Sequence, residues 1–174
     1  DETQVTTTPP IPGYETFTVH KGTVVEFQSS ESFNITATGP ILVGHYMTGS
    51  NYPGFAVACT EGAIPSGIGD PALSLGVPTE QYLSSYVVLT PPGYEKNYVN
   101  IMAVTGTSLS MDGTPITESP TPIGTTGYEL YRFEVSVGVH AFSGNAVFGL
   151  TAYGYDCDVS YAYPGGLKLQ ALNE

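Results

Sequence analysis

Apolar and polar residues alternate along most of this chain, which is the pattern of half-buried β-strands. The clearest alternation lies at 128–136, where Tyr131, Phe133 and Val135 fall on one face. Similar patterns predict further strands, at 15–20, 23–28, 33–37, 41–47, 86–90, 98–104, 108–111, 114–117, 139–142 and 147–155. One helical turn is expected at 79–83. About a dozen strands with almost no helix predict an all-β, β-sandwich-like fold.

The order of these segments predicts one domain. Residues 1–13 are rich in Thr and Pro and indicate an extended lead-in or linker, so that 14–174 would form a single compact β domain. Three glycines recur at one offset (144 − 39 = 105), which indicates an internal duplication. They are Gly39, Gly44 and Gly49, matched by Gly144, Gly149 and Gly154. We interpret 15–58 and 128–170 as pseudo-repeat units around a central segment, 78–118; the alternative is chance matching in a Gly-rich chain.

The stretch 153–166 combines strand and turn signals. It reads Tyr-Gly-Tyr-Asp-Cys-Asp-Val-Ser-Tyr-Ala-Tyr-Pro-Gly-Gly, with tyrosines at alternate positions on both sides of an acidic turn. This pattern predicts a strand that leaves the sheet, makes a loop around Cys157 and returns.

The two cysteines both lie in loop patterns rather than in apolar strands. Cys59 belongs to a Gly/Pro-rich loop, 49–72, and Cys157 to the acidic turn. We expect them to form one disulfide, which requires an oxidising compartment. Closing so long a loop is worth roughly 4–5 kcal/mol by chain entropy. The alternative is two unpaired buried thiols.

Charge excludes some classes of partner. The 174 residues include 16 acidic and four basic side chains, for a net charge of −12. A nucleic-acid-binding face cannot be built from four basic residues, and an anionic membrane surface is disfavoured. No apolar stretch approaches the ~20 residues of a membrane span. Few lysines, many Thr, Gly and Tyr residues and one expected disulfide favour a secreted or cell-surface protein.

A bound metal is an open alternative. The disulfide would bring Glu61 and Asp70 towards Asp156 and Asp158, and carboxylates on loops suit Ca²⁺. However, the chain has no Asp-x-Asp-x-Asp-Gly loop, and solvated acidic side chains are the simpler interpretation. We therefore expect no cofactor, with Ca²⁺ as the alternative.

Catalytic patterns are scarce. There is no Gly-x-Ser-x-Gly motif, and His20, His45 and His140 each lie in a strand-like pattern that predicts a hydrogen-bonded sheet histidine. We expect a non-enzymatic protein; a carboxylate pair for glycoside hydrolysis, which distant residues can supply, is kept as an alternative.

Thirteen tyrosines without any tryptophan indicate a different chemistry, that of ligand binding. Tyrosines beside acidic groups stack on sugars and anchor protein partners. The candidate ligand-binding residues are Tyr52, Tyr155, Tyr163, Asp156 and Asp158. The alternative is that these tyrosines are ordinary strand residues that fill the core.

Four motifs in order resemble a known family. They are Gly69-Asp70-Pro71, Pro78-Thr79-Glu80-Gln81, Met111-Asp112-Gly113 and the closing 153–166 stretch. Together they are similar to the N-terminal domain of the IgG-Fc-binding protein family, found in mucus-associated animal proteins and bacterial surface proteins. The resemblance covers roughly 15–170.

From the residues and this resemblance we expect a recognition or adhesion module that binds a surface glycan, a mucin-like ligand or a protein. The alternative is a structural domain that self-assembles within a larger adhesin or fibre. A glycan array and the mass in solution separate the two.

Overall fold

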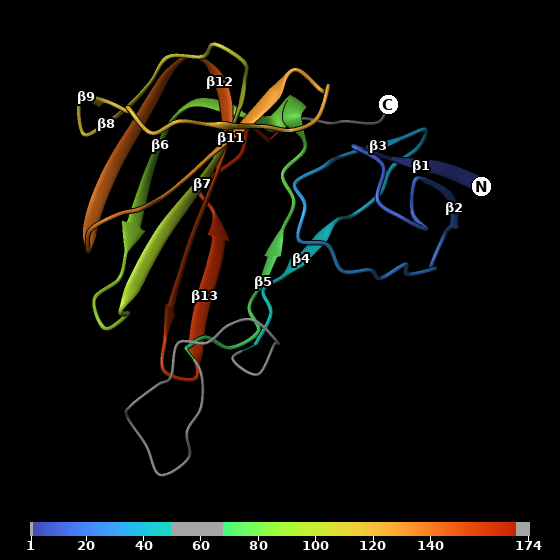
Figure 1. Cartoon of the computed structure of the whole chain (residues 1–174), viewed down its shortest axis with the longest axis horizontal. Coiled ribbons are helices and arrows are strands. Elements are labelled where there is room, and N and C mark those ends of the chain that lie inside the picture. The colour runs from blue at the N-terminus through green and yellow to red at the C-terminus, as the bar shows by residue number, and fades with distance from the viewer. Residues whose placement is uncertain (1, 50–67, 170–174) are drawn as a thin grey trace.

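The structure, a computed structural model, describes residues 2–49 and 68–169 and is nearly all β, as the alternation predicts (Figure 1). The N-terminal strands are β1 (Glu2–Thr8), β2 (Thr16–His20), β3 (Asn34–Ala37), β4 (Gly44–Tyr46) and β5 (Leu73–Leu75). The 3-10 turn η1 (Thr79–Gln81) follows at the expected helical turn. The remaining strands are β6 (Leu83–Thr90), β7 (Lys96–Val104), β8 (Leu109–Met111), β9 (Thr114–Pro115), β10 (Thr121–Pro122), β11 (Tyr128–Glu134), β12 (Gly138–Asp156) and β13 (Val159–Pro164).

The long strand β12 organises the main sheet. Its first part pairs with β6 and β8, and its last part pairs with β7 and β13. The register against β6 shifts between Ser143 and Phe148, and such irregularities bend a strand. The 139–142 and 147–155 segments, predicted as separate strands, are therefore one bent strand. The bend brings the two sets of partners face to face as a sandwich-like pair of layers (Figure 1).

The core fills the space between these layers. It contains side chains from both ends of β12 and from its partners: Tyr86, Val88, Val99, Ile101, Phe142, Phe148, Leu150 and Ala152. Burying apolar surface at about 25 cal/mol per Å² makes this cluster the main source of stability. The outer face of β6 and β12 carries alternate residues that stay exposed, among them Val87 and Val139.

A tight turn joins β8 to β9, as its Asp-Gly sequence predicts. Asp112 and Gly113 have φ angles of 51° and 78°, which is the pattern of a type I′ turn.

The N-terminal sheet corrects one prediction. Residues 2–8 are not a lead-in to the folded domain, because β1 is the central strand of a three-stranded sheet of order β2-β1-β3. Val5 and Thr7 of β1 are buried. Thr and Pro content indicated an extended chain, and the chain is extended, but alternate threonines also suit a strand that is covered on one face.

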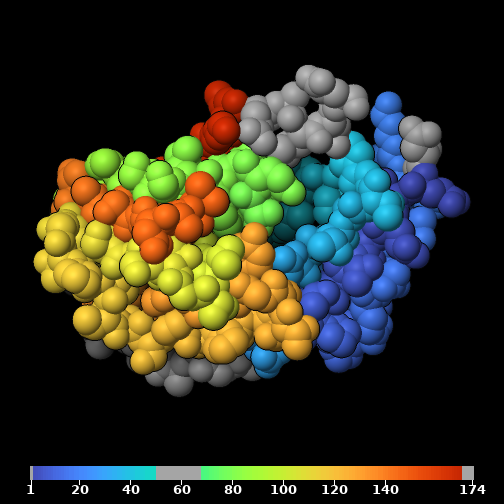
Figure 2. Space-filling model, turned by 90° about the horizontal axis from the view of Figure 1, so that it is seen from above, coloured from blue at the N-terminus to red at the C-terminus, as the bar shows by residue number. Residues whose placement is uncertain are grey.

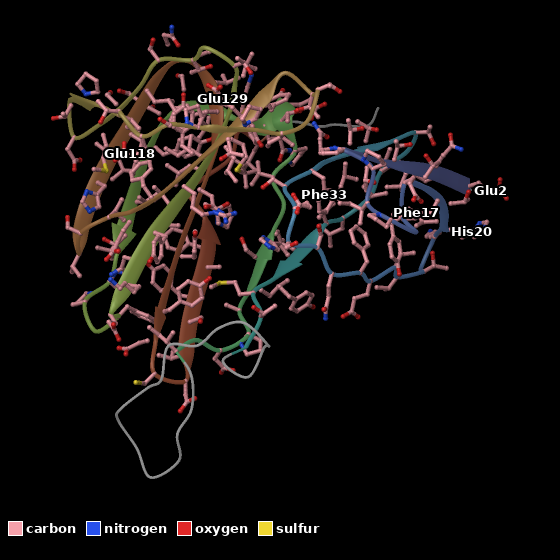
Figure 3. The ribbon with its side chains drawn as sticks, viewed as in Figure 1. Glu2, Phe17, His20, Phe33, Glu118 and Glu129 are labelled. Atoms are coloured by element: carbon pink, nitrogen blue, oxygen red, sulfur yellow. The ribbon has the colours of Figure 1, made fainter. Side chains whose placement is uncertain are left out.

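An aromatic cluster covers that sheet. Tyr14 stacks on Phe27 with ring centroids 4.5 Å apart, and Phe27 also contacts Phe17 and Phe33. Figure 3 shows Phe17 and Phe33 within this N-terminal lobe, residues 2–37. The strand predicted at 23–28 is absent from the described residues, because this segment has no regular pairing; Phe27 instead packs into the cluster.

The lobe lies at one end of the molecule and touches the main body (Figure 2). At this junction Gly124 faces Pro9 so closely that an added Cβ would lie 2.9 Å from the proline ring. A glycine is therefore required at 124, both for this approach and for its φ of 52°.

The pairing does not reproduce the predicted duplication. Gly44 lies in the short, exposed strand β4, which pairs with β5, whereas Gly149 is buried in β12 opposite Met102. β2 and β3 each pair with β1, whereas β12 pairs directly with β13. In the parts of 15–58 and 128–170 that the structure describes, the two units have different strand partners, and the duplication itself stays a prediction.

Candidate functional site

The acidic turn is the tip of the β12–β13 hairpin. Asp156 pairs with Val159, so Cys157 and Asp158 are the two residues of the loop. Asp158 is exposed and has a φ of 52°, a left-handed conformation that Asp tolerates better than most residues. A side-chain oxygen of Asp156 accepts the N–H of Cys157 at 2.7 Å. The stretch thus leaves the sheet and returns as its pattern predicts.

The end of the Gly/Pro-rich loop docks on this hairpin. Ile68 forms a β-bridge with Cys157, and the Gly69 N–H donates to the Asp156 carbonyl oxygen at 2.8 Å. The Asp70 N–H donates to Ser160 Oγ at 2.9 Å. Residues 68–70 therefore lie beside the acidic turn.

The rest of that loop, with Tyr52, Cys59 and Glu61, lies outside the described residues. The Cys59–Cys157 disulfide and the role of Tyr52 stay predictions.

The acidic side chains do not by themselves form a metal centre. Within 2–49 and 68–169 no group of three or more His, Cys, Asp or Glu side chains could hold a metal ion. Asp70, Asp156 and Asp158 come from neighbouring backbone positions, but Glu61 is outside the description. Calcium therefore stays an untested alternative to the expectation of no cofactor.

Tyrosines line both faces of this hairpin end. On one face Tyr153 stacks on Tyr98 at 5.5 Å and meets Tyr155 edge-on. Tyr155 is half-buried, and Gly69 lies against its ring, since an added Cβ would come within 3.0 Å. Burial raises the pKa of Tyr153 to about 12, so its hydroxyl stays protonated and donates to Asn100 Oδ1. Tyr155 is thus largely a packing residue.

On the opposite face Tyr161 and Tyr163 stack at 6.0 Å, and Tyr94 meets Tyr161 edge-on. The Tyr161 hydroxyl donates to Oδ1 of the buried Asn97 at 2.6 Å. The Tyr163 hydroxyl donates to the Leu89 carbonyl oxygen at 2.6 Å and accepts the Leu89 N–H at 2.9 Å. Burial raises the pKa of both phenols, which keeps them as donors.

A groove opens along this second face, between β6 and β13. It has a volume of about 480 Å³ and is lined by Val87, Val88, Leu89, Pro91, Tyr161 and Tyr163. We call it the edge groove. It is wide open to solvent, and its lining is apolar apart from tyrosine hydroxyls that are already hydrogen-bonded. Of the predicted ligand-binding residues that the structure describes, Tyr163 lines it.

Sequence reasoning missed the other groove residues. Val87 and Leu89 alternate with Tyr86, Val88 and Thr90, and that pattern signalled a strand with one exposed face. The exposed apolar residues Val87 and Leu89 could have indicated a binding surface. The sequence does not show which edge of β6 lacks a partner among the described strands, because that depends on the bend in β12.

The buried His140 joins a residue trio that resembles a catalytic one. Its Nδ1 lies 2.8 Å from Asp112 Oδ2, and its Nε2 lies 2.8 Å from the Ser136 carbonyl oxygen but 3.5 Å from Ser136 Oγ. Both ring nitrogens therefore face acceptors, an arrangement that favours the doubly protonated ring. Burial opposes the charge, but the hydrogen bonds to Asp112 and Ser136 raise the pKa of His140 overall. His140 is a hydrogen-bonded sheet histidine, as predicted, and neither ring nitrogen is directed at the Ser136 hydroxyl as a base would be.

These features define a class of protein: an all-β module that offers surfaces for contact. In the part of the chain that the structure describes, no helix is long and apolar enough to cross a membrane. The family model described as IgGFc binding protein matches residues 1–154, and the chain belongs to that family. The family is one of binding proteins rather than enzymes, which agrees with the resemblance drawn from the four motifs. Searches of curated proteins and of solved structures found no match.

Proposed function

We propose that this chain is a recognition module of a secreted or cell-surface protein and that it binds a protein or glycoprotein ligand through the β13 end of the main sheet. The edge groove is the observation that carries this proposal. It is open and apolar, and it lies on the strand that begins at the exposed acidic turn. The family description, IgGFc binding protein, supports a protein ligand.

The same end offers two kinds of contact. The edge groove supplies aliphatic and aromatic surface, which gives most of the energy in protein interfaces. Asp158 supplies an exposed negative charge at the hairpin tip, which suits a basic patch on a partner. A mucin-like ligand is compatible with both, because its protein backbone carries the sugars.

A binding screen with matched variants tests this function. The purified chain would be measured against a glycan array, immobilised mucin and the Fc fragment of IgG. Val87→Asp places a charge in the edge groove, and Asp158→Asn removes the charge at the tip. Val19→Asp, in the N-terminal lobe, is the control at a distance.

A ligand whose binding falls at least ten-fold with Val87→Asp and not with Val19→Asp supports the assignment. Equal losses for the two variants place recognition elsewhere.

A second function, assembly into a larger fibre, is favoured by one observation. β6 has an exposed edge and no charged residue, and such edges pair with other chains. The mass in solution, measured across a range of protein concentrations, tests this alternative.

A further inference from the structure

Among the residues that the structure describes, no strand pairs with the edge of β6 beside the edge groove. β12 is the strand paired with β6 among the described residues, in antiparallel register with Leu89 opposite Val139 and Val87 opposite Ala141. The Leu89 N–H and carbonyl oxygen both bond to the Tyr163 hydroxyl, so they point away from β12. Residues two apart on a strand point the same way, so the N–H and carbonyl oxygen of Val87 also face the groove.

Tyr163 caps this edge at Leu89, but the rest of the edge lacks the usual protection. Natural edge strands are blocked by charged residues, prolines or bulges, because a free row of N–H and carbonyl groups pairs with other chains. β6 reads Leu-Ser-Ser-Tyr-Val-Val-Leu-Thr, with no charge and no proline. The exposed side chains beside the groove are apolar, with Val87 68% and Leu89 54% exposed, whereas Ser84 and Ser85 are exposed polar residues earlier in the strand. The strand therefore presents both backbone and side-chain groups for pairing.

The groove chemistry favours a peptide over a sugar. The two hydroxyl protons in the lining are already donated, from Tyr161 to Asn97 and from Tyr163 to Leu89. A sugar buried here would leave its own hydroxyls short of partners, which is costly. An extended peptide instead supplies hydrogen-bond partners for the outward-facing N–H and carbonyl oxygen of Val87. It can also place an apolar side chain in the groove.

Charge further limits the kinds of peptide that fit the groove. No charged side chain of the described residues lines the groove, so a buried ionic group would go unpaired there. The net charge of −12 repels acidic segments and attracts basic ones. The fitting occupant is an uncharged extended segment with basic residues at its flanks.

We propose that the edge of β6 around Val87 binds such a segment of a protein partner as an added strand, with one apolar side chain in the edge groove. This inference rests on the proposed function and names its ligand class. It also separates the candidate ligands: the backbone of a protein or glycoprotein is bound here, and free glycans are not.

A synthetic peptide tests the inference directly. The probe is Lys-Val-Thr-Val-Thr-Val-Lys, acetylated and amidated at its ends, titrated into the ¹⁵N-labelled full chain and followed by amide chemical shifts. We expect saturable shifts along 83–90 and 161–163. Two further peptides carry N-methyl groups on alternate residues: one peptide at the odd-numbered positions and the other at the even-numbered positions. Because only one set of amides in an added strand faces β6, one methylated peptide should lose at least ten-fold in affinity and the other should bind like the parent.

A matched pair of protein variants completes the test. Val87→Pro removes the N–H that faces the groove and leaves the ladder to β12 intact, so the affinity for the probe should fall at least ten-fold. Val139→Thr changes an exposed side chain on the same face, one strand from the edge, and should stay within two-fold. If Val87→Pro does not fold, the binding of the two methylated peptides to the wild-type chain tests the inference instead.

Three results would overturn the inference. One is a titration without saturable shifts in 83–90, and another is equal binding of both methylated peptides. The third is a dimer in which β6 pairs with a second copy and the probe does not compete. Each of these leaves the outcome of the ligand screen untouched, so failure of the inference and failure of the proposed function are distinguishable.

Discussion

The Tyr163 hydroxyl closes the gap between two strands that are not paired with each other. It donates to the Leu89 carbonyl oxygen at 2.6 Å and accepts the Leu89 N–H at 2.9 Å. One phenol thus satisfies both backbone groups of a residue on the edge of β6. Further along the same edge Val87 has no such bridge, and the edge groove opens beside it.

Removing this bridge should cost a modest amount of stability. Tyr163→Phe leaves the ring in the groove but removes the hydrogen-bond partner of the Leu89 N–H and carbonyl oxygen. We therefore expect a loss of about 1 kcal/mol in the free energy of unfolding. Hydrogen exchange at the Leu89 amide should accelerate at the same time. Urea unfolding and amide exchange measure the two effects; an unchanged exchange rate at Leu89 would contradict the geometry.

A glycine in β12, Gly154, permits the close approach of both neighbouring strands, the β7 backbone and the Tyr161 ring of β13. An added Cβ at Gly154 would lie 2.7 Å from the Lys96 carbonyl oxygen and would also meet the Tyr161 ring. Gly154→Ala should therefore destabilise the fold by roughly 1–3 kcal/mol, because backbone must move to make room. Ser84→Ala, at an exposed position of β6, is the control and should stay within about 0.5 kcal/mol. Equal melting temperatures for the two variants would show that β13 is more loosely packed than described.

The contact between His140 and Asp112 predicts a pH dependence. Because the folded pKa of His140 is raised above the usual 6.5, its stabilising effect is present below 6.5 and is lost as pH rises through the folded value. The pKa of Asp112 is lowered from 3.8, chiefly by its hydrogen bond to His140, so its effect is lost only as pH falls below that range. The pair should thus stabilise the β8–β9 hairpin most between about pH 4 and 6.5.

Asp112→Asn provides the matched variant, since Asn keeps the left-handed turn and an acceptor for the Ala141 N–H. Urea unfolding at pH 5.5 and pH 8.5 would be measured for both proteins. We expect the wild type to lose more stability than the variant on going to pH 8.5. A parallel fall in both would show that the pair does not titrate as a unit.

The predicted Cys59–Cys157 bridge has a direct chemical test. The unreduced chain should be lighter by two hydrogens than the reduced chain, and reduction should lower stability by roughly 4–5 kcal/mol if chain entropy dominates. Intact mass before and after reduction measures the first effect. Alkylation of both cysteines in the unreduced chain would end this prediction.

Local patterns predicted most of the strands correctly. Alternation at 128–136 and 98–104 corresponds to β11 and β7, and the Asp-Gly dipeptide made the tight turn between β8 and β9. These features depend on neighbours in sequence. The placement of β1 does not, because its partners β2 and β3 come later and only their pairing turns a Thr/Pro-rich segment into a central strand.

The local features of the candidate site were predictable from the sequence, whereas the features that depend on distant strands were not. The tyrosine alternation and the acidic turn of the β12–β13 hairpin are local, and the sequence identified them. The edge groove is not local: it exists because the bend in β12 places Leu89 and Tyr163 face to face, although 74 residues separate them. The recurring glycine spacing did not predict strand partners, because equal spacing in sequence does not require equal pairing: Gly44 pairs with β5 and Gly149 with β7.

We propose recognition at the β6 and β13 edges, and hydrogen exchange with a bound ligand tests this proposal most directly. Deuterium uptake of the full chain would be followed by mass spectrometry with and without a saturating ligand from the screen, mucin or the Fc fragment. We predict that slowing of exchange concentrates in peptides covering 83–91 and 157–164. Protection confined to the N-terminal lobe, residues 2–37, with uptake at 83–91 unchanged, would contradict the account.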